Sequence, residues 1–490
     1  MTMITRRQML AGLAGIGATA FATPAFVRSA HAAMTHADLA PLRITTRQIE
    51  VKGRAATVYG LLTPNGVSGL TLNREDGFAL RLENAIADPS LIHWHGLTPP
   101  WRDDGVPDIS QPLLAPGASY DYRFALRRAG THWMHSHHGL QEQQLMAAPL
   151  IIHDAKDRKT DMQEVVVMLH DFSFADPMEL LEKLRGGSGH GAMRHGAGHG
   201  AGHNMGGMAG AMNTMPGNMM MDLNDIDHNA YLANDRTLDD PEIIATERGG
   251  MVRLRVINGG ASTSFTLDLG RVTGTLVAVD GNPVAPLTGS QFPIAIAQRL
   301  DIVLRMPDDG DAVPVLALRE GARERTGIIL QPAGVNVRKI DPAGATDGPV
   351  VGLDLETRLR SIETLADRPA DRHITVDLTG TMAGYVWGMA IDGVENIPVR
   401  VRAQDRVEIT FRNPSMMSHP MHLHGHHFQV AAINDVRIKG AMRDTVMVPP
   451  GQTVTIAFDA DNPGKWAFHC HHMYHMATGM MTTLDYDGIA

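Results

Sequence analysis

One strand-like segment occurs three times along this chain of 490 residues, and each copy ends in an asparagine. The copies run from Gly77 to Asn84 (GFALRLEN), from Gly250 to Asn258 (GMVRLRVIN) and from Asp405 to Asn413 (DRVEITFRN). Self-similarity of this kind indicates that one structural unit has been repeated. Between the copies, short β-rich runs alternate with Gly, Pro, Asn and Asp turns, a pattern typical of β-sandwiches. We therefore expect an all-β protein of three sandwich domains.

The repeats set the expected domain bounds. We predict a first sandwich over residues 42–157, a second over 162–335 and a third over 370–490. The segment 336–369, which is rich in Asp, Pro and Gly in its first half, is interpreted as a connector. A chain of this length has room for such a division.

Histidines follow the repeated strand in the outer copies but not in the middle copy. In the first copy, His93 and His95 stand nine and eleven residues after the asparagine. The same two positions hold Leu267 and Leu269 in the second copy and His422 and His424 in the third. A second repeat leads from Ala-Pro-Gly or Pro-Pro-Gly to His135-Ser136-His137 in the first domain and His469-Cys470-His471 in the third. Histidines two apart on a strand share a face. We expect these imidazoles to meet between the first and third domains and to hold three coppers.

The only cysteine of the chain, Cys470, lies inside the last of these histidine pairs. With His475, Met480 and a more distant histidine it supplies the ligand types of a blue-copper centre, namely a thiolate, imidazoles and a long axial thioether. On a strand, the Cys470 side chain points away from those of His469 and His471. This tripeptide is therefore predicted to contact two metal sites and to carry electrons from one to the other.

Residues 1–32 have the features of an export signal. Arg6 and Arg7 precede an apolar, Gly- and Ala-rich run to about Phe26, and Ala30-His31-Ala32 offers a small-x-small cleavage site. We expect twin-arginine export to the periplasm and removal of this segment, because the run is short and weakly hydrophobic for a stable membrane insertion. An exported chain with one cysteine forms no internal disulfide, so the thiol is expected to have a chemical role.

Composition bears on the partners of the protein. With 43 basic and 53 acidic residues, a formal net charge of −10, the chain gives no electrostatic reason to expect nucleic acid. Residues 186–221 consist largely of glycine, methionine and histidine and are expected to form a loop within the second domain. Thioethers suit Cu(I), so we favour weak copper capture by this loop over a plain solvated linker.

Four motifs together resemble, in order and spacing, the signatures of the three-domain multicopper oxidases. They are His93-Trp94-His95-Gly96, His135-Ser136-His137, His419-Pro420-Met421-His422-Leu423-His424-Gly425, and His469-Cys470-His471 with His475 and Met480. The resemblance covers essentially the whole chain after the export signal. It implies three cupredoxin-like Greek-key β-sandwich domains, four copper ions, reduction of dioxygen and a monomer.

Matching positions to the family motifs implies a role for each ligand. A type 1 copper would take His419, Cys470, His475 and axial Met480. A type 2 copper would take His93 and His422. A type 3 pair would take His95, His135, His137, His424, His469 and His471. A methionine in the axial place implies a moderate reduction potential.

Within the family, the motifs look most similar to those of the bacterial copper-resistance and copper-efflux oxidases. Reduction of dioxygen to water consumes protons as well as electrons, so carboxylates near the cluster are needed to deliver them. Asp104 matches the family's acidic residue near the type 2 copper and is predicted to be catalytic. Glu142 is the second catalytic candidate, with a purely structural carboxylate as the alternative.

Two positions depart from the efflux branch. Those enzymes carry a glutamate directly after the last type 1 histidine and an aspartate four residues before the first, where this chain has Met476 and Ser415. The first change puts one proton route in doubt, and the second weakens the transfer of that branch's Cu(I) site. Met417 matches a methionine of that site, with packing as the alternative role.

The expected function is oxidation of Cu(I), of phenolic small molecules or of both at the type 1 copper, coupled to reduction of dioxygen and serving copper tolerance. Two alternatives remain open: a laccase unrelated to copper tolerance, and a copper-sequestering protein. A copper nitrite reductase is disfavoured. It would need one histidine pair per interface and a trimer, whereas this chain carries all four pairs itself.

Overall fold

The repeated segment forms the central strand of three similar arrangements. The computed structural model describes residues 39–186 and 223–489, and in it the copies are β4 (Phe78–Asn84), β12 (Met251–Asn258) and β24 (Arg406–Arg412). Each lies between a parallel and an antiparallel neighbour. In chain order the parallel neighbours are β1 (Ala40–Val51), β9 (Gln163–Phe172) and β20 (Arg372–Thr381). The antiparallel neighbours are β6 (Ser119–Phe124), β17 (Arg299–Arg305) and β30 (Thr453–Asp459). The three copies therefore occupy equivalent places, which confirms the repeat.

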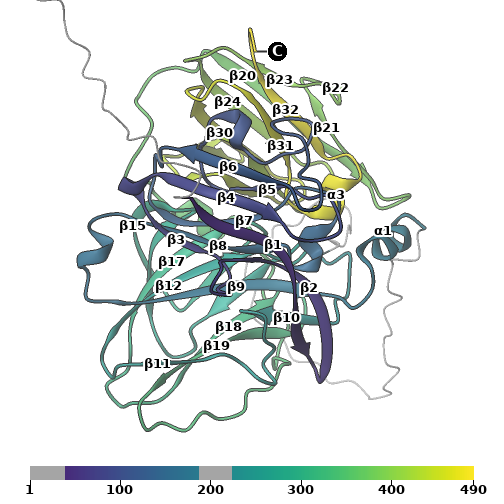
Figure 1. Ribbon diagram of the computed structural model, residues 1–490. Coiled ribbons are helices and arrows are strands. Elements are labelled where there is room, and N and C mark those ends of the chain that lie inside the picture. Colours follow the sequence, from purple (N-terminus) through teal and green to yellow (C-terminus); the bar gives the residue numbers. More distant parts are fainter. Residues whose placement is uncertain (1–38, 187–222, 490) are drawn as a thin grey trace, which may run out of the picture. The chain divides into compact units, whose positions relative to one another are not determined.

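Strand β4 belongs to a sheet that packs against a second sheet from the same part of the chain (purple to blue in Figure 1). The first sheet has the order β2-β1-β4-β6, with β2 at Arg54–Leu62. The second has the order β3-β8-β7-β5, with β3 at Leu70–Asn73, β8 at Ala147–His153, β7 at Gly130–Ser136 and β5 at Ile92–His93. Leu82 from β4 and Met134 from β7 lie in one hydrophobic core. A shared core between two sheets makes this part a β-sandwich.

The second sandwich has the sheets β10-β9-β12-β17-β14-β15 and β11-β19-β18-β13-β16. Its further strands are β10 (Ala230–Ala233), β11 (Ile243–Thr246), β13 (Phe265–Asp268), β14 (Gly274–Val279), β15 (Asn282–Gly289), β16 (Gln291–Ile294), β18 (Val313–Arg319) and β19 (Arg325–Pro332). Helix α1 (Pro177–Arg185) follows β9. Leu267 and Leu269, which stand where the outer copies have histidines, are buried in the core. The second sandwich therefore has buried apolar side chains at the positions where the first and third sandwiches have imidazoles.

The third sandwich has the sheets β22-β21-β20-β24-β30-β26-β27, with β28 beside β26, and β23-β32-β31-β25-β29. Its further strands are β21 (Val386–Ile391), β22 (Val394–Glu395), β23 (Val399–Val401), β25 (His419–Leu423), β26 (Phe428–Ile433), β27 (Val436–Arg437), β28 (Met442–Arg443), β29 (Thr445–Val448), β31 (Lys465–Cys470) and β32 (Met481–Tyr486). Helix α2 (Asp354–Arg358) precedes it and α3 (Met473–Ala477) lies between β31 and β32. Cys470 and Met480 belong to its hydrophobic core.

The asparagine that ends each repeated segment makes the same hydrogen bonds every time. Its Oδ1 accepts a hydrogen bond from the backbone N–H two residues later, at Ile86, Gly260 and Ser415. Its Nδ2 donates to the carbonyl of a later segment, at Leu114, Ile294 and Val448. The side chain thus shapes the turn after the strand and ties it to a second segment. This explains why the repeat ends in asparagine and not in an apolar residue.

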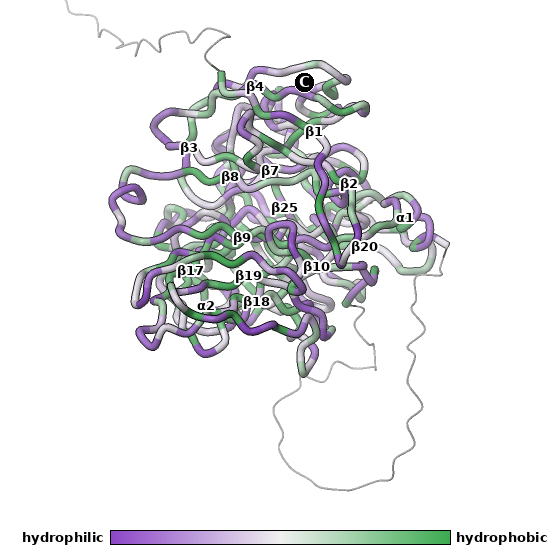
Figure 2. The backbone as a smooth tube through the Cα atoms, turned by 60° about the horizontal axis from the view of Figure 1, so that its bottom comes forward, coloured by the Kyte–Doolittle hydropathy of each residue, from purple (hydrophilic) through white to green (hydrophobic). Residues whose placement is uncertain are grey.

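The sequence-based expectation of an all-β fold is confirmed, and apolar residues gather along the strands (green in Figure 2). The expected export signal, residues 1–32, lies outside the described residues, as does the Met- and His-rich stretch beyond Gly186. Within the described part of the chain, no helix has the length and apolar character needed to cross a membrane.

Candidate metal centres

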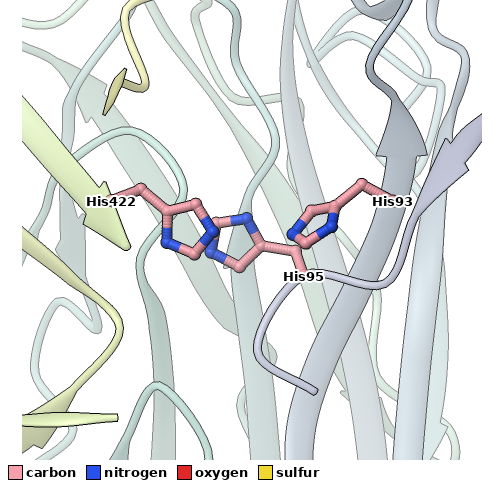
Figure 3. Close-up of side chains that lie close together, drawn as sticks. All are labelled: His93, His95 and His422. Atoms are coloured by element: carbon pink, nitrogen blue, oxygen red, sulfur yellow. The ribbon is translucent and has the colours of Figure 1, made fainter. Parts of the chain in front are cut away.

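The four His-x-His pairs meet in one place, with strands β5 and β7 on one side and β25 and β31 on the other. The rings of His95 and His422 stack with their centroids 3.8 Å apart, and the rings of His93 and His424 are equally close. Figure 3 shows His93 and His95 from the first sandwich facing His422 from the third. The histidine pairs of the first and third sandwiches therefore meet, although His137 and His469 are 332 positions apart in the sequence.

The imidazoles form groups whose nitrogen atoms could bind one ion each. One group is His137, His424 and His469, a second is His95, His135 and His471, and a third joins His93, His95 and His422. The Nε2 atom of His469 lies 2.9 Å from Nε2 of His424 and 3.3 Å from Nε2 of His137. The Nε2 atoms of His135 and His471 are 3.4 Å apart. All eight rings are buried except that of His137, which is partly exposed.

Hydrogen bonds hold most of these rings through Nδ1 and turn Nε2 toward the centre. The Nδ1–H groups of His93 and His422 donate to the backbone carbonyls of Asp104 and Asp444 at 2.9 and 2.8 Å. The Nε2 atoms of both rings are buried without a hydrogen-bond partner among the described residues, and so is Nδ1 of His95. A buried nitrogen lone pair without a partner is costly, and a metal ion is the partner that suits it. The donor set therefore fits copper.

The protonation state of the rings also suits metal binding. Burial lowers the pKa of each of His95, His135, His137, His422, His424 and His471 well below the ordinary value of histidine. Burial lowers the pKa of His469 to about 3. Neutral imidazoles are the form that binds metal, so these rings need not lose a proton first.

The two predicted catalytic carboxylates both contact candidate ligands. Asp104 is fully buried, and its Oδ2 accepts a hydrogen bond from Nδ1 of His424 at 2.8 Å. Its other oxygen, Oδ1, lies 3.3 Å from Nδ1 of His93. Glu142 lies in a short 3-10 turn with Oε2 2.7 Å from Nδ1 of His135. Burial, together with repulsion from Asp171, raises the pKa of Glu142 well above its usual range.

The predicted type 1 ligands form a separate group. Cys470 Sγ lies 3.7 Å from Nδ1 of His419 and 3.8 Å from Nδ1 of His475, and these two nitrogens are 3.1 Å apart. The backbone N–H of Met480 donates to the carbonyl of His475, and the Met480 carbonyl accepts from the N–H of Cys470. Burial raises the pKa of the Cys470 thiol. Copper must therefore displace a proton to bind the thiolate, as is usual for a metal at cysteine.

Residues that sequence reasoning missed surround this group. The ring of Trp387 lies 4.2 Å from that of His475, and Oδ2 of Asp225 accepts from Nε2 of His475 at 3.2 Å. Tyr385 donates a short hydrogen bond to the same oxygen. These side chains come from segments with no recognisable motif. The hydroxyl of Ser415, a position that departs from the efflux branch, lies 2.8 Å from Nε2 of His419.

Met417 and three further histidines lie near the centres without joining the groups above. His472 stacks on His475 with ring centroids 3.8 Å apart. Met417 is buried, and with Met447 and His472 it lines a cavity of about 20 Å³ beside the type 1 group. His426 and His427 line a larger cavity, of about 780 Å³, where all three sandwiches contribute residues.

Comparison with known proteins supports a common origin. Three models described as multicopper oxidase match residues 45–157, 164–325 and 367–488. A relative from Mycobacterium tuberculosis, multicopper oxidase MmcO, is 31% identical over 87% of this chain and 82% of its own length. Copper resistance protein A from Escherichia coli is 28% identical, with 96% of each chain covered.

Solved structures show the same fold. The structure of Fet3p, titled as a multicopper oxidase that functions in iron import, superposes with a TM-score of 0.73 at 19% identity. The match covers 91% of this chain and 90% of that one. The laccase from Botrytis aclada superposes with a TM-score of 0.70 at 20% identity, over 91% of this chain and 86% of its own.

Proposed function

Because this chain belongs to the multicopper oxidase family, we propose that it oxidises Cu(I) at a type 1 copper and reduces dioxygen at a trinuclear cluster. Members of this family bind copper and use dioxygen with a reducing substrate. In the proposed reaction four Cu(I) ions each lose one electron, and one dioxygen molecule takes up four electrons and four protons to give two waters. The substrate ions leave as Cu(II), and the enzyme returns to its starting state.

We assign the four coppers as the family motifs imply. His419, Cys470, His475 and Met480 would hold the type 1 copper. His93 and His422 would hold the type 2 copper, and the type 3 pair would be held by His95, His135 and His471 with His137, His424 and His469. Copper bound there would supply the one-electron steps and the place where dioxygen is reduced. Cys470, the last residue of β31, lies between His469 and His471, so the covalent chain would join the two centres.

The protein's own groups position the ligands and hold protons. Oδ1 of Asp104 is buried without a hydrogen-bond partner among the described residues, so it is the atom at which a proton would be held. Glu142 has a raised pKa and is therefore able to remain protonated near His135. Both carboxyls are within reach of the cluster ligands, as a general acid must be.

Burial of the type 1 group is the observation that favours Cu(I) over a larger donor. His419, Cys470, His475 and Met480 are all 0% exposed. The cavity beside them, about 20 Å³, has room for roughly one water molecule. Met417 and Met447 are among the residues that line it, and a thioether suits Cu(I) and not a phenol.

Oxygen uptake by the copper-loaded protein tests this proposal. Chelated Cu(I) and a dimethoxyphenol are compared, each with and without added free Cu(II). We expect Cu(I) to be turned over directly and the phenol to react slowly unless Cu(II) is added. Met417→Leu keeps the side-chain volume but removes the thioether, so it should slow Cu(I) oxidation and leave phenol oxidation unchanged. Fast phenol oxidation without added Cu(II), with Cu(I) a poor donor, would contradict the proposal.

That contrary outcome would favour the second candidate, a laccase unrelated to copper tolerance. Its support is that Laccase-1 from Fomitopsis schrenkii is 27% identical over 85% of this chain and 80% of its own length. Against it stands the closed type 1 group, since a phenol must approach a ligand ring closely enough to pass an electron.

Copper tolerance is the proposed role, and the similarity to copper resistance protein A supports it. We further propose that the protein acts as a monomer in the periplasm after export directed by residues 1–32. If protection came from sequestration instead, Cys470→Ser would abolish oxygen uptake while host copper tolerance survived. If catalysis protects, both should be lost together.

A further inference from the structure

Arg299, a side chain of the second sandwich, contacts both of the other sandwiches. Arg299, the first residue of β17, is 0% exposed. Its Nη1 and Nη2 donate to the two carboxylate oxygens of Asp444 in the third sandwich, at 2.7 and 2.5 Å. Its Nε donates to the backbone carbonyl of Thr131 in the first sandwich at 3.1 Å. A two-pronged arginine–carboxylate pair fixes orientation as well as distance.

Asp444 in turn holds two candidate copper ligands. Its Oδ1 lies 3.1 Å from Nε2 of His95, and its backbone carbonyl accepts from Nδ1 of His422 at 2.8 Å. An ionised carboxylate only accepts hydrogen bonds, so the proton of His95 must be on Nε2. The lone pair of His95 is then on Nδ1, the nitrogen that is buried without a partner.

The ring nitrogen of His95 that is hydrogen-bonded differs from that of its neighbours. His93, His422, His424 and His469 are hydrogen-bonded through Nδ1, which leaves Nε2 for metal. His95 is hydrogen-bonded through Nε2 and can offer only Nδ1. A rotation of this ring would remove the nitrogen from the groups it forms with His422 and with His471. Asp444, together with the Thr445 hydroxyl 3.2 Å from the same Nε2, therefore holds His95 with Nδ1 as the nitrogen left for a metal.

The backbone beside His95 leaves room for this arrangement. Gly96 has a φ of +88°, and a Cβ there would lie 2.4 Å from Nη2 of Arg299 and 3.0 Å from Oδ2 of Asp444. Any side chain would push the arginine or the carboxylate away. The glycine of the His-Trp-His-Gly motif thus serves the contact between Arg299 and Asp444.

We propose that Arg299 is a positioning residue of the trinuclear site, acting through Asp444 to present Nδ1 of His95 to copper. The proposal rests on the assignment of these histidines as copper ligands. It gives the second sandwich, which carries no assigned ligand, a direct part in the metal centre. Residues that orient ligands in this way typically change metal affinity by about 10- to 100-fold.

A purely structural role is the alternative, because Arg299 also belongs to a buried charged network. Asp280 contacts Arg299, and Arg443 joins Asp280 to Glu356. Loss of a partner from such a network destabilises the whole fold and would affect both copper centres alike. Selective loss of trinuclear copper distinguishes the two roles.

The experiment compares Arg299→Lys with Arg255→Lys in the full-length copper-loaded protein. Arg255 is an equally buried arginine paired with a buried aspartate, since it donates to Asp301 at 2.9 Å, and Asp301 accepts from Thr131. Lysine keeps the charge of arginine but cannot make the two-pronged contact. Each protein is dialysed against graded chelator, and total copper and the blue absorption of the Cys470 thiolate are measured. Thermal unfolding of the copper-free proteins is measured in parallel.

We expect Arg299→Lys to lose trinuclear copper at about 10- to 100-fold lower chelator than Arg255→Lys, while the blue absorption persists in both. Equal copper retention in the two variants would overturn the proposal, as would parallel loss of blue and trinuclear copper. If Arg299→Lys does not fold, Asp444→Asn is judged by the same criterion. Failure of the wild-type protein to consume oxygen would refute the proposed function. The copper retention of the two variants could still be compared, because that measurement does not depend on oxygen uptake.

Discussion

Two aspartates hold the cluster histidines in a matched way. Asp104 accepts from His93 of its own sandwich through its backbone carbonyl and from His424 of the other through its carboxylate. Asp444 accepts from His422 of its own sandwich through its carbonyl, and its carboxylate contacts His95 of the other. The difference lies in their surroundings: Asp444 is paired with Arg299, whereas Oδ1 of Asp104 has no hydrogen-bond partner within the described chain. The Asp444 carboxylate is held by an arginine, whereas the Asp104 carboxylate keeps one oxygen free of a donor among the described residues, which supports its proposed role in holding a proton.

Replacing Asp104 should therefore slow turnover without emptying the site. Asp104→Asn keeps the size and one acceptor for His424, but its amide cannot transfer a proton. We expect kcat for oxygen uptake at saturating Cu(I) to fall by about 100-fold, within the range for loss of a general acid. Copper content should stay unchanged. Asp103→Asn is the control, because Asp103 is partly exposed and hydrogen-bonded to Tyr120. An equal loss in both variants would count against the role of Asp104.

The residues found from sequence and those missed differ in where their signal lies. Cys470 and its neighbouring histidines were predictable because their spacing within a strand carries the chemistry. Asp444, Arg299 and Asp225 were not, because each acts through a partner far away in sequence, and a single charged residue looks the same in a surface loop. Asp104 and Asp444 match only in three dimensions, where each carboxylate contacts a histidine of the opposite sandwich.

At the scale of elements, the terminal asparagine of the repeat connects fold and site. In the second sandwich the Asn258 amide ties together backbone only, at Thr263 and Ile294. In the third, Oδ1 of Asn413 also accepts from the hydroxyl of Ser415, which bonds Nε2 of His419. The hydrogen bonds of the asparagine hold only backbone in the second sandwich, whereas in the third they also connect, through Ser415, to a candidate copper ligand.

Alanine at these two asparagines should separate stability from metal binding. Each substitution leaves buried backbone groups unpaired, so we expect each to lower the free energy of unfolding by about 1–3 kcal/mol. Asn413→Ala should in addition shift or weaken the blue absorption of the Cys470 site, because Ser415 loses its anchor. Asn258→Ala should leave that absorption as in the wild type. Denaturant titration and visible spectra provide the measurements, and a blue band altered equally in both variants would refute the connection.

Strands were predictable from the sequence where a pattern repeats, and other elements and strand pairings were not. The three copies correctly predicted β4, β12 and β24, because an inherited segment keeps its pairing. The parallel partner of each copy precedes it by tens of residues, and no local signal shows which strand will pair there. Helix α1 was also not predicted, although Pro177 at its start and Asp176 as its cap are standard signals. Its nine residues are too short for a helical period to stand out.

At the scale of the whole molecule, burial of histidine makes the copper-free protein sensitive to acid. Burial lowers the pKa of His426 and of His427 to about 4 each. Below the ordinary pKa of about 6.5 the unfolded chain binds protons that the folded chain does not, so stability falls as pH falls toward the folded values. Each ring should lower the free energy of unfolding by about 2 kcal/mol between pH 7 and about pH 5.

Denaturant unfolding of the copper-free protein at these two pH values measures the effect. We expect lower stability at the lower pH, and a smaller difference when His426 and His427 are both replaced by glutamine. A flat pH dependence in the wild type would show that water reaches these rings in the folded protein and that their pKa values are not lowered.

The positions that meet at the cluster lie far apart along the chain, since His137 and His469 are 332 residues apart. Contacts of such long range form late in folding, because the entropy of closing the intervening chain must be overcome first. Neither outer sandwich holds a complete cluster by itself. Under the proposed ligand assignment, copper would be retained at the cluster only after the third sandwich has docked on the first. Uptake of cluster copper would then report that the chain has finished folding, and a misassembled molecule would be recognised by its failure to carry this copper.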